Sequence, residues 1–182
     1  MKHDLDVISA GTNSILMVDD DPAALEELVD IVDMEGWTPL TATSVDQAME
    51  MLAVTPNIGV VVTDVHFGGG HDDTANGIQL ISRAQARFPD RQLSFVVLSG
   101  DPDALCSSVQ TGAVDFLNKP LDPDELVSAI QTAWKSRGHE RTGSELTAFL
   151  LTKMQKTAHA LKEAQENLHK AAQKENDRKA DN

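Results

Sequence analysis

The chain has a single cysteine, no long apolar run and few basic residues, and each shortage excludes a class of protein. The cysteine, Cys106, cannot form an internal disulfide, and a helical setting without an obvious base nearby predicts a buried or inert thiol. No stretch approaches the length of a membrane span, and residues 1–13 lack the apolar core of a signal peptide. We therefore expect a soluble cytoplasmic protein with no membrane partner.

Basic residues are scarce relative to acidic ones, and the net charge is −14 at pH 7. The imbalance lies in residues 1–139, which hold 22 acidic and 7 basic side chains, whereas residues 140–182 hold 7 and 8. Binding to nucleic acid requires clustered Lys and Arg that displace counterions. The sequence therefore predicts no direct contact with nucleic acid, and the change in charge indicates two regions.

What the chain does contain is a regular alternation of short apolar strands and amphipathic helices. The first helix should begin at Pro22, a favoured first helical position, and Ser44 should cap the second. The unbroken apolar run 58–63 is typical of a strand buried on both faces. Five strand–helix units predict an α/β protein with a doubly wound, five-stranded parallel sheet. The other strands are expected at 15–18, 38–42, 93–99 and 115–118, and the remaining helices near 77–88, 102–110 and 126–134.

Within each helix, apolar residues recur on one side, which is expected to cover the sheet. In the first helix the opposite side is acidic, with Glu26, Glu27, Asp30 and Asp33. The residues expected to face inward are Leu25, Leu28, Val29 and Val32, then Val45, Ala48, Met49 and Leu52, then Ile78, Ile81 and Ala84, and finally Leu126, Val127, Ile130 and Trp134.

Polar side chains follow three of the expected strands. Asp64 ends the third strand, Asp19, Asp20 and Asp21 follow the first, and Lys119 follows the fifth. The carboxyl ends of strands in an open parallel sheet meet at one crevice, so these residues are candidates for a site. Carboxylates a few ångströms apart repel one another by about 4 kcal/mol per pair at an effective dielectric constant near 20, and they therefore need a cation. Mg²⁺ prefers such oxygen ligands and is therefore the cation that we expect at this site.

Beyond residue 138 the composition changes, and residues 144–178 contain no Pro or Gly. A single helix of 35 residues would reach roughly 50 Å at about 1.5 Å per residue, too long to lie on a domain of this size. The heptad spacing predicts a coiled coil with a partner helix, and a parallel homodimer is the simplest form. A solvated helix of a truncated chain is the alternative. The two seams are Thr147, Met154, Leu161 and Leu168, and Leu150, Thr157, Ala164 and Ala171.

In their order along the chain, these signals resemble the receiver domain of two-component response regulators. The resemblance covers about residues 13–137 and implies a flavodoxin-like fold. We expect a flexible tail at 1–13, a receiver domain at 14–137, and a linker with a long helix at 138–182. The residues that carry the resemblance are Ile15 to Pro22, Asp64, Ser99-Gly100, Asp115-Phe116 and Lys119-Pro120.

The resemblance implies a role for each strand-end residue. Asp64 would be the nucleophile that takes a phosphoryl group from the phosphohistidine of a sensor histidine kinase or a histidine phosphotransfer protein. Asp20, Asp64 and the backbone carbonyl of His66 would bind Mg²⁺, and Asp19 would act through a water. Lys119, joined to Pro120 by a cis peptide, would pair with the phosphoryl group.

The same resemblance implies how the signal leaves the site. Ser99 and Phe116 would be the switch residues and would alter the surface of the fourth helix, fifth strand and fifth helix. The dimeric C-terminal helix would transmit that change. No familiar output domain follows residue 138, so the protein either acts through its helices or has lost a downstream domain.

The sequence departs from the family pattern after Asp64. Phe67-Gly68 stands where most receivers have Met-Pro, and the matching glycine is Gly77, thirteen residues after Asp64 instead of eight. The loop 67–76 is therefore about five residues longer, and we expect a flexible lip over the site. Its glycines do not have the spacing of a dinucleotide fingerprint. A transition-metal site from His66, His71, Asp72 and Asp73 would be costly to order on such a loop.

His66 and Asp101 lie two residues past Asp64 and Ser99, where the family tunes attack of water on the acyl phosphate.

Two alternative functions remain. A Mg²⁺-dependent phosphatase of the aspartyl-phosphate type would need a second Asp where His66 stands. The other alternative is a dimeric interaction module with a receiver fold that works without phosphorylation.

Overall fold

A computed structural model describes residues 13–67, 76–100 and 113–137, together with six single positions between 148 and 162. The chain divides into two compact units, Met1–Glu140 and Arg141–Asn182. In the second unit the six described positions are helical. The predictions for Cys106, Asp101, the greater part of the loop 67–76, the helix at 102–110 and the coiled-coil seams fall outside the described residues.

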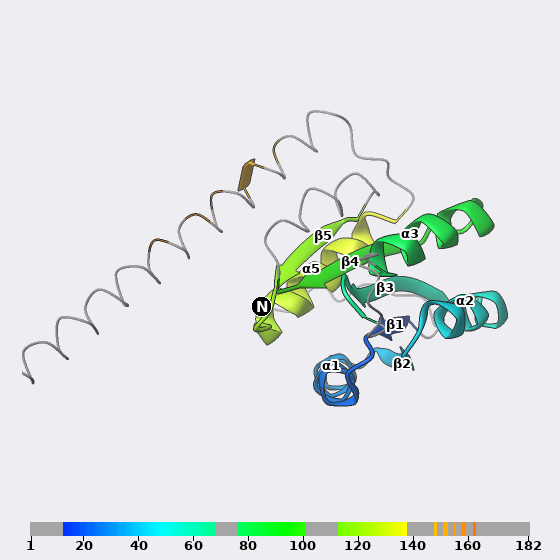
Figure 1. Ribbon diagram of the computed structural model, residues 1–182, viewed down its shortest axis with the longest axis horizontal. Helices are drawn as coiled ribbons and strands as arrows, with labels where there is room; N and C mark the ends of the chain where they lie inside the picture. The colour runs from blue at the N-terminus through cyan, green and yellow to red at the C-terminus, as the bar shows by residue number, and fades with distance from the viewer. Residues whose placement is uncertain are drawn as a thin grey trace, which may run out of the picture. The chain divides into compact units, whose positions relative to one another are not determined.

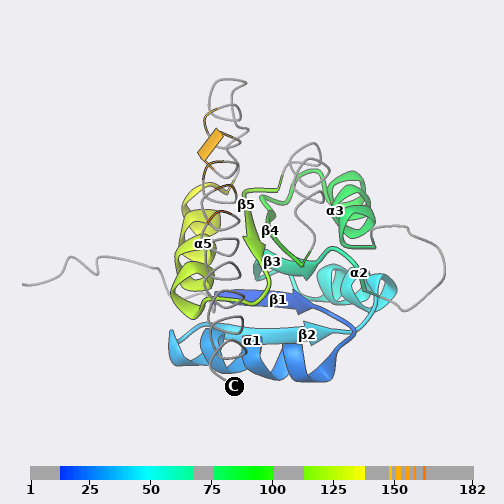
Figure 2. The same cartoon turned by 60° about the vertical axis from the view of Figure 1, so that its left-hand side comes forward.

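The first unit is built on a parallel sheet with the strand order β2-β1-β3-β4-β5. Figures 1 and 2 show α1 and α5 over one face of this sheet and α2 and α3 over the other. The predicted doubly wound, five-stranded sheet is confirmed. The strands are β1 (Ser14–Val18), β2 (Thr38–Ala42), β3 (Ile58–Asp64), β4 (Ser94–Ser99) and β5 (Asp115–Asn118), and the helices are α1 (Pro22–Met34), α2 (Val45–Val54), α3 (Asn76–Arg87) and α5 (Pro123–Lys135).

Side-chain caps determine where three of the helices begin. The carboxylate of Asp21 accepts a hydrogen bond from the N–H of Ala23 at 2.9 Å, with Pro22 in the first turn. Ser44 Oγ accepts from the N–H of Gln47 at 3.2 Å, which confirms the predicted cap of α2. Asp122 caps α5 in the same manner. Each cap satisfies backbone donors that have no partner inside the helix.

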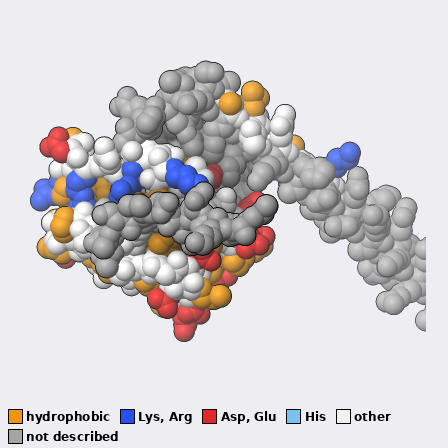
Figure 3. All heavy atoms as spheres, turned by 180° about the vertical axis from the view of Figure 1, so that it is seen from behind, with side chains coloured by type: hydrophobic (Ala, Val, Ile, Leu, Met, Phe, Trp, Pro, Cys, Tyr) orange, Lys and Arg blue, Asp and Glu red, His pale blue; other side chains and the backbone are white. Residues whose placement is uncertain are grey.

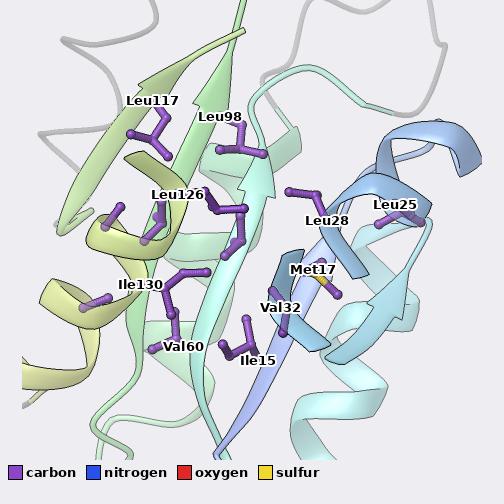
Figure 4. Close-up of a cluster of buried hydrophobic side chains, with 14 residues drawn as sticks. Ile15, Met17, Leu25, Leu28, Val32, Val60, Leu98, Leu117, Leu126 and Ile130 are labelled. Carbon is purple, nitrogen blue, oxygen red and sulfur yellow. The ribbon is translucent and has the colours of Figure 1, made fainter. Parts of the chain in front are cut away.

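A core of buried apolar side chains lies between the sheet and the pair α1 and α5, as Figure 4 shows. All seven residues of β3 are buried, as expected of a central parallel strand. The inward face of α5 differs from the prediction, because Val127 and Trp134 are half-buried while Ala129 and Ala133 are buried. In α3 the predicted Ile81 and Ala84 are buried, together with Leu80, whereas the predicted Ile78 is half-buried. Val29 and Val45 are also half-buried.

The end of α5 packs on the start of β3. The guanidinium of Arg137 lies over the ring of Trp134, 4.2 Å from its centroid. A side chain at Gly59 would overlap both of these residues, so the glycine leaves them room. In the described part of the chain, the indole Nε1 of Trp134 is a buried polar atom that has no hydrogen-bond partner.

Arg91 joins the end of α2 to the start of β3. Its guanidinium donates to the carbonyl oxygens of Thr55 at 3.1 Å, Pro56 at 3.3 Å and Ile58 at 2.9 Å, and also to that of Leu52. The last carbonyls of a helix have no partner within it and carry partial negative charge. Arg91 therefore satisfies acceptors that would otherwise depend on water.

Basic side chains gather on one face of this unit. Figure 3 shows a row of Lys and Arg side chains there, with Asp and Glu side chains around the margins of the face. Arg83 and Arg87 lie on α3, which contains no acidic residue, and Arg83 forms an ion pair with Asp46 at 3.1 Å. Among the described helices, none is long and apolar enough to span a membrane.

Candidate functional site

Three charged residues meet at the carboxyl edge of the sheet. Lys119 Nζ lies 2.9 Å from Asp19 Oδ2 and 3.1 Å from Asp64 Oδ1. Asp19 and Asp64 are only 2% and 7% exposed, whereas Lys119 is half-buried. The ammonium therefore sits between two buried carboxylates that follow different strands.

The strand register brings these residues to one level. Val18 pairs with Thr63, which sets Asp19 beside Asp64 across β1 and β3. On the other side, Val65 N–H donates to the Leu98 carbonyl and Lys119 N–H donates to the Ser99 carbonyl, each at 2.9 Å. Positions 19, 64, 99 and 119 are thus aligned by backbone pairing of parallel strands.

The carboxylate of Asp64 is held on both oxygens. Oδ1 pairs with Lys119, and Oδ2 accepts from the N–H of His66 at 3.1 Å. Burial raises the pKa of Asp64 above its ordinary value, and the negative charge of Asp19 adds to the rise, while Lys119 and the His66 N–H oppose it.

The pKa of Lys119 is also raised. Burial alone would lower it, but hydrogen bonds and charge attraction from Asp19 and Asp64 together outweigh burial. Lys119 is therefore protonated at neutral pH and acts as a fixed positive charge at this edge.

The three consecutive acidic residues after β1 have different surroundings. Asp19 is buried, and its Oδ1 accepts from the N–H of Asp21 at 3.0 Å. Asp20 is exposed at the edge of the site. Asp21 caps α1, a role that we did not assign from the sequence although an Asp directly before a first-turn proline is its usual signal.

The remaining candidates also lie near this edge. Ser99 ends β4 and is 1% exposed, and Phe116 lies within β5 and is 4% exposed. His66 is exposed just past β3. The peptide between Lys119 and Pro120 is cis.

The donors at this edge are suited to a hard cation. Asp19, Asp20, Asp64 and the His66 carbonyl all offer oxygen, which Mg²⁺ prefers. In the described part of the chain, no three His, Cys, Asp or Glu side chains converge closely enough to hold a metal by themselves. Mg²⁺ fits this arrangement, because it commonly takes one or two carboxylates and completes its shell with waters and phosphate oxygens.

Two further residues, Thr63 and Gly77, hold the backbone next to Asp64, and the sequence did not indicate this role. Thr63 Oγ1 donates to the Asp64 carbonyl at 2.9 Å, and the N–H of Gly77 donates to the Val65 carbonyl at 3.1 Å. The available signal was a hydroxyl-bearing residue at the end of an otherwise apolar strand.

Known proteins are similar to this chain in both sequence and fold. A model of the response regulator receiver domain matches residues 15–131. The two-component response regulator PprB of Pseudomonas aeruginosa is 29% identical over 161 residues, covering 86% of this chain and 56% of PprB. The transcriptional regulatory protein FixJ of Bradyrhizobium diazoefficiens is 31% identical over 121 residues, covering 65% of this chain and 55% of FixJ. The chain thus spans about half the length of these relatives.

Solved structures of receiver domains are similar to this chain as well. A response regulator receiver protein from Pseudomonas putida is 26% identical, with a TM-score of 0.60 and coverage of 68% of this chain and 98% of that one. A CheY-like receiver domain protein from Methanospirillum hungatei, 21% identical, has the same fold, with a TM-score of 0.58 and coverage of 70% and 97%. The flavodoxin-like fold is confirmed. The chain therefore belongs to the response regulator receiver domain family, a family of signalling domains.

Proposed function

We propose that this protein is the phosphoacceptor of a two-component system and that Asp64 receives the phosphoryl group. Membership of the receiver family implies a cognate histidine kinase, acting directly or through a histidine phosphotransfer protein. The observation that carries the proposal is Lys119 between Asp19 and Asp64, at 2.9 and 3.1 Å. A fixed positive charge beside a strand-end carboxylate can stabilise charge that develops on a phosphoryl group.

The transfer exchanges one bond to phosphorus for another. A carboxylate oxygen of Asp64 bonds to phosphorus while the bond from phosphorus to the histidine nitrogen breaks, and that nitrogen keeps the electron pair. The product is an acyl phosphate on Asp64. Because Lys119 already lies beside Asp64 Oδ1, it can pair with the phosphoryl oxygens without a large movement.

The cation for this site would be Mg²⁺, which receiver domains typically bind. Asp20, Asp64 and the backbone carbonyl of His66 would hold it, and Asp19 would act through a water. An indirect role suits Asp19, since its carboxylate already accepts from Lys119 and from the N–H of Asp21. When bound, Mg²⁺ neutralises charge on the transferring group.

Ser99 and Phe116 would convert phosphorylation into a change of surface. The Ser99 hydroxyl would bind a phosphoryl oxygen, and the Ser99 carbonyl already accepts from the N–H of Lys119. Movement at Ser99 would therefore act on the neighbouring strand β5, which contains Phe116. The affected surface would comprise residues 102–110, β5 and α5.

The output would pass through residues 138–182, and a receiver domain at 14–137 would control it. Heptad spacing in the tail supports a homodimeric coiled coil that reports the alignment of two receivers. The match to PprB, at 161 residues, is longer than the receiver model, so part of the tail resembles that relative as well. The cytoplasm, where response regulators generally act, is the expected location.

Intact mass after incubation with Mg²⁺ and acetyl phosphate tests the proposal. We expect one added phosphoryl group on the wild type and none on Asp64→Asn. No addition to the wild type from acetyl phosphate or from phosphorylated histidine phosphotransfer proteins would favour the interaction module that works without phosphorylation. Addition to Asp64→Asn would place the acceptor elsewhere.

A further inference from the structure

The start of α3 lies in direct contact with the backbone of Asp64. A Cβ atom placed on Gly77 would overlap the Asp64 carbonyl oxygen and lie 3.0 Å from the carbonyl carbon. Both are backbone atoms of a buried central strand, so neither can swing aside as the end of a long side chain could. Any residue larger than glycine at position 77 must therefore displace either α3 or Asp64.

Space, and not backbone conformation, is what requires this glycine. Among the described glycines, Gly36 has the positive φ, +75°, that favours glycine for its conformation. Gly77 has no such φ, and what distinguishes it is its distance from Asp64.

Thr63 holds the same carbonyl. Its Oγ1 donates to the Asp64 carbonyl at 2.9 Å, and it would lie 3.1 Å from a Cβ on Gly77. Thr63 is fully buried, and the N–H of Gly77 donates to the Val65 carbonyl at 3.1 Å. The Asp64 carbonyl is thus held by a hydroxyl and by close packing, and the Val65 carbonyl that follows it is held by a backbone bond to α3.

We propose that Gly77 and Thr63 are positioning residues for phosphorylation of Asp64. They fix the main chain of Asp64, and that main chain fixes the distance from its carboxylate to Lys119 and the placement of the His66 carbonyl two residues later. The inference rests on the proposed function and adds the residues that hold the acceptor in register.

The described residues on both sides of the segment 68–75 are held close to Asp64. Phe67 is 3% exposed, and Gly77 is buried against the Asp64 backbone.

Substitution at Gly77 tests the packing half of the proposal, with Gly59 as the matched control. We expect Gly77→Ala to slow phosphorylation by acetyl phosphate at least about tenfold, since a displacement of about 1 Å can cost on the order of 10²-fold in rate. Gly59→Ala adds the same methyl to β3 and crowds Trp134 at the opposite end of the strand. It should therefore lower stability without changing the rate.

Substitution at Thr63 separates positioning from stability. Thr63→Ser keeps the hydroxyl and loses a buried methyl, so it should be less stable but phosphorylated at the wild-type rate. Thr63→Val keeps the volume and loses the hydrogen bond, so it should be phosphorylated more slowly. The midpoint of urea unfolding gives stability, and its shift on adding Mg²⁺ reports the site without any transfer; we expect a smaller shift for Thr63→Val and Gly77→Ala.

The outcomes distinguish this inference from the proposed function. A wild type that takes no phosphoryl group would overturn the proposed function. A wild type that is phosphorylated, together with Gly77→Ala and Thr63→Val that match its rate and its Mg²⁺ shift, would overturn the positioning role alone. If Gly77→Ala fails to fold, the comparison of Thr63→Ser with Thr63→Val still decides.

Discussion

At the scale of the single residue, Lys119 serves two buried carboxylates at once. The attraction of Asp19 and Asp64 raises its pKa even though burial acts in the opposite direction. Without that ammonium, two carboxylates would face each other in a partly desolvated site. Lys119 therefore contributes to stability as well as to the proposed chemistry.

Replacement of Lys119 should expose that contribution. We expect Lys119→Met to lower the free energy of unfolding by about 1–2 kcal/mol, less than a fully buried pair would lose, because the lysine is partly exposed. Added Mg²⁺ should restore part of the loss by supplying another cation. Urea unfolding measures both effects, and Lys135→Met, at an exposed lysine in the last turn of α5, is the control. Equal stability of Lys119→Met and wild type would contradict the expectation.

The raised pKa of Asp64 predicts a dependence of stability on pH. A carboxyl whose pKa rises on folding favours the folded state when protonated, and this contribution is complete below its ordinary value of 3.8. The contribution is lost as pH rises through the raised value. Asp64→Asn should therefore be more stable than wild type at neutral pH, and the difference should shrink as the pH approaches 3.8. Urea unfolding across this range measures it, and a difference that grows in acid would refute the argument.

Single residues also show where prediction from sequence ends. Asp64 and Lys119 could be identified because each follows a strand, and parallel strands end at one edge. The hydroxyl of Thr63 at the end of an apolar strand is a signal, but its role does not follow from that signal, because the role depends on the close approach of Gly77, which belongs to a different element. Contacts between elements that meet only in the folded chain leave little trace in local pattern.

At the scale of the element, signals within one turn of the chain predict where a helix begins, whereas the face that it buries depends on packing against other elements. The starts of α1 and α2 follow from Pro22 and Ser44, because a cap acts within one turn of the chain. The prediction for the inward face of α5 was partly wrong, because it followed hydrophobicity, which ranks Trp134 above Ala133. Small residues let this helix approach the sheet closely, and the large indole instead packs beside Gly59 at the helix end.

Arg91 gives a prediction at this scale, because it links α2 to β3. We expect Arg91→Ala to lower the free energy of unfolding by about 1–3 kcal/mol, as several partly buried carbonyls lose a charged donor. Arg91→Lys should recover less than half, because an ammonium lacks the planar fork of the guanidinium. Urea unfolding gives both values.

The control for Arg91 is Arg87→Ala. The guanidinium groups of Arg87 and Arg91 lie 5.8 and 5.4 Å from the ring centroid of Phe88, so removing Arg87 measures what contact with that ring contributes. Comparable losses from Arg87→Ala and Arg91→Ala would assign the effect to Phe88 and not to the carbonyls.

At the scale of the whole molecule, charge and length divide the chain. The acidic excess lies in residues 1–139, and the tail is nearly neutral, with uncharged residues at its heptad seam positions. A tail of this kind can associate with a second copy without the repulsion that the acidic region would bring. The proposed dimer is therefore a property of residues 138–182.

Light scattering over a range of concentrations tests that dimer. We expect the wild type to have twice the mass of one chain and Leu161→Glu, at a seam position, to be a monomer. Lys162→Glu, at an exposed neighbouring position, should keep the dimer. A wild type that is monomeric at every concentration, with and without a phosphoryl mimic, would remove the proposal.

The ion pair between Asp19 and Lys119 has a consequence for biosynthesis. Its partners are 100 positions apart, and Asp64, the second carboxylate that Lys119 contacts, ends a third strand. During translation, the chain must have released the residues of β5 before these charges can meet, and contacts of such separation form late in folding. Under the proposed function, a nascent or partly assembled chain lacks the ammonium beside its acceptor, and phosphorylation should begin only once the sheet is complete.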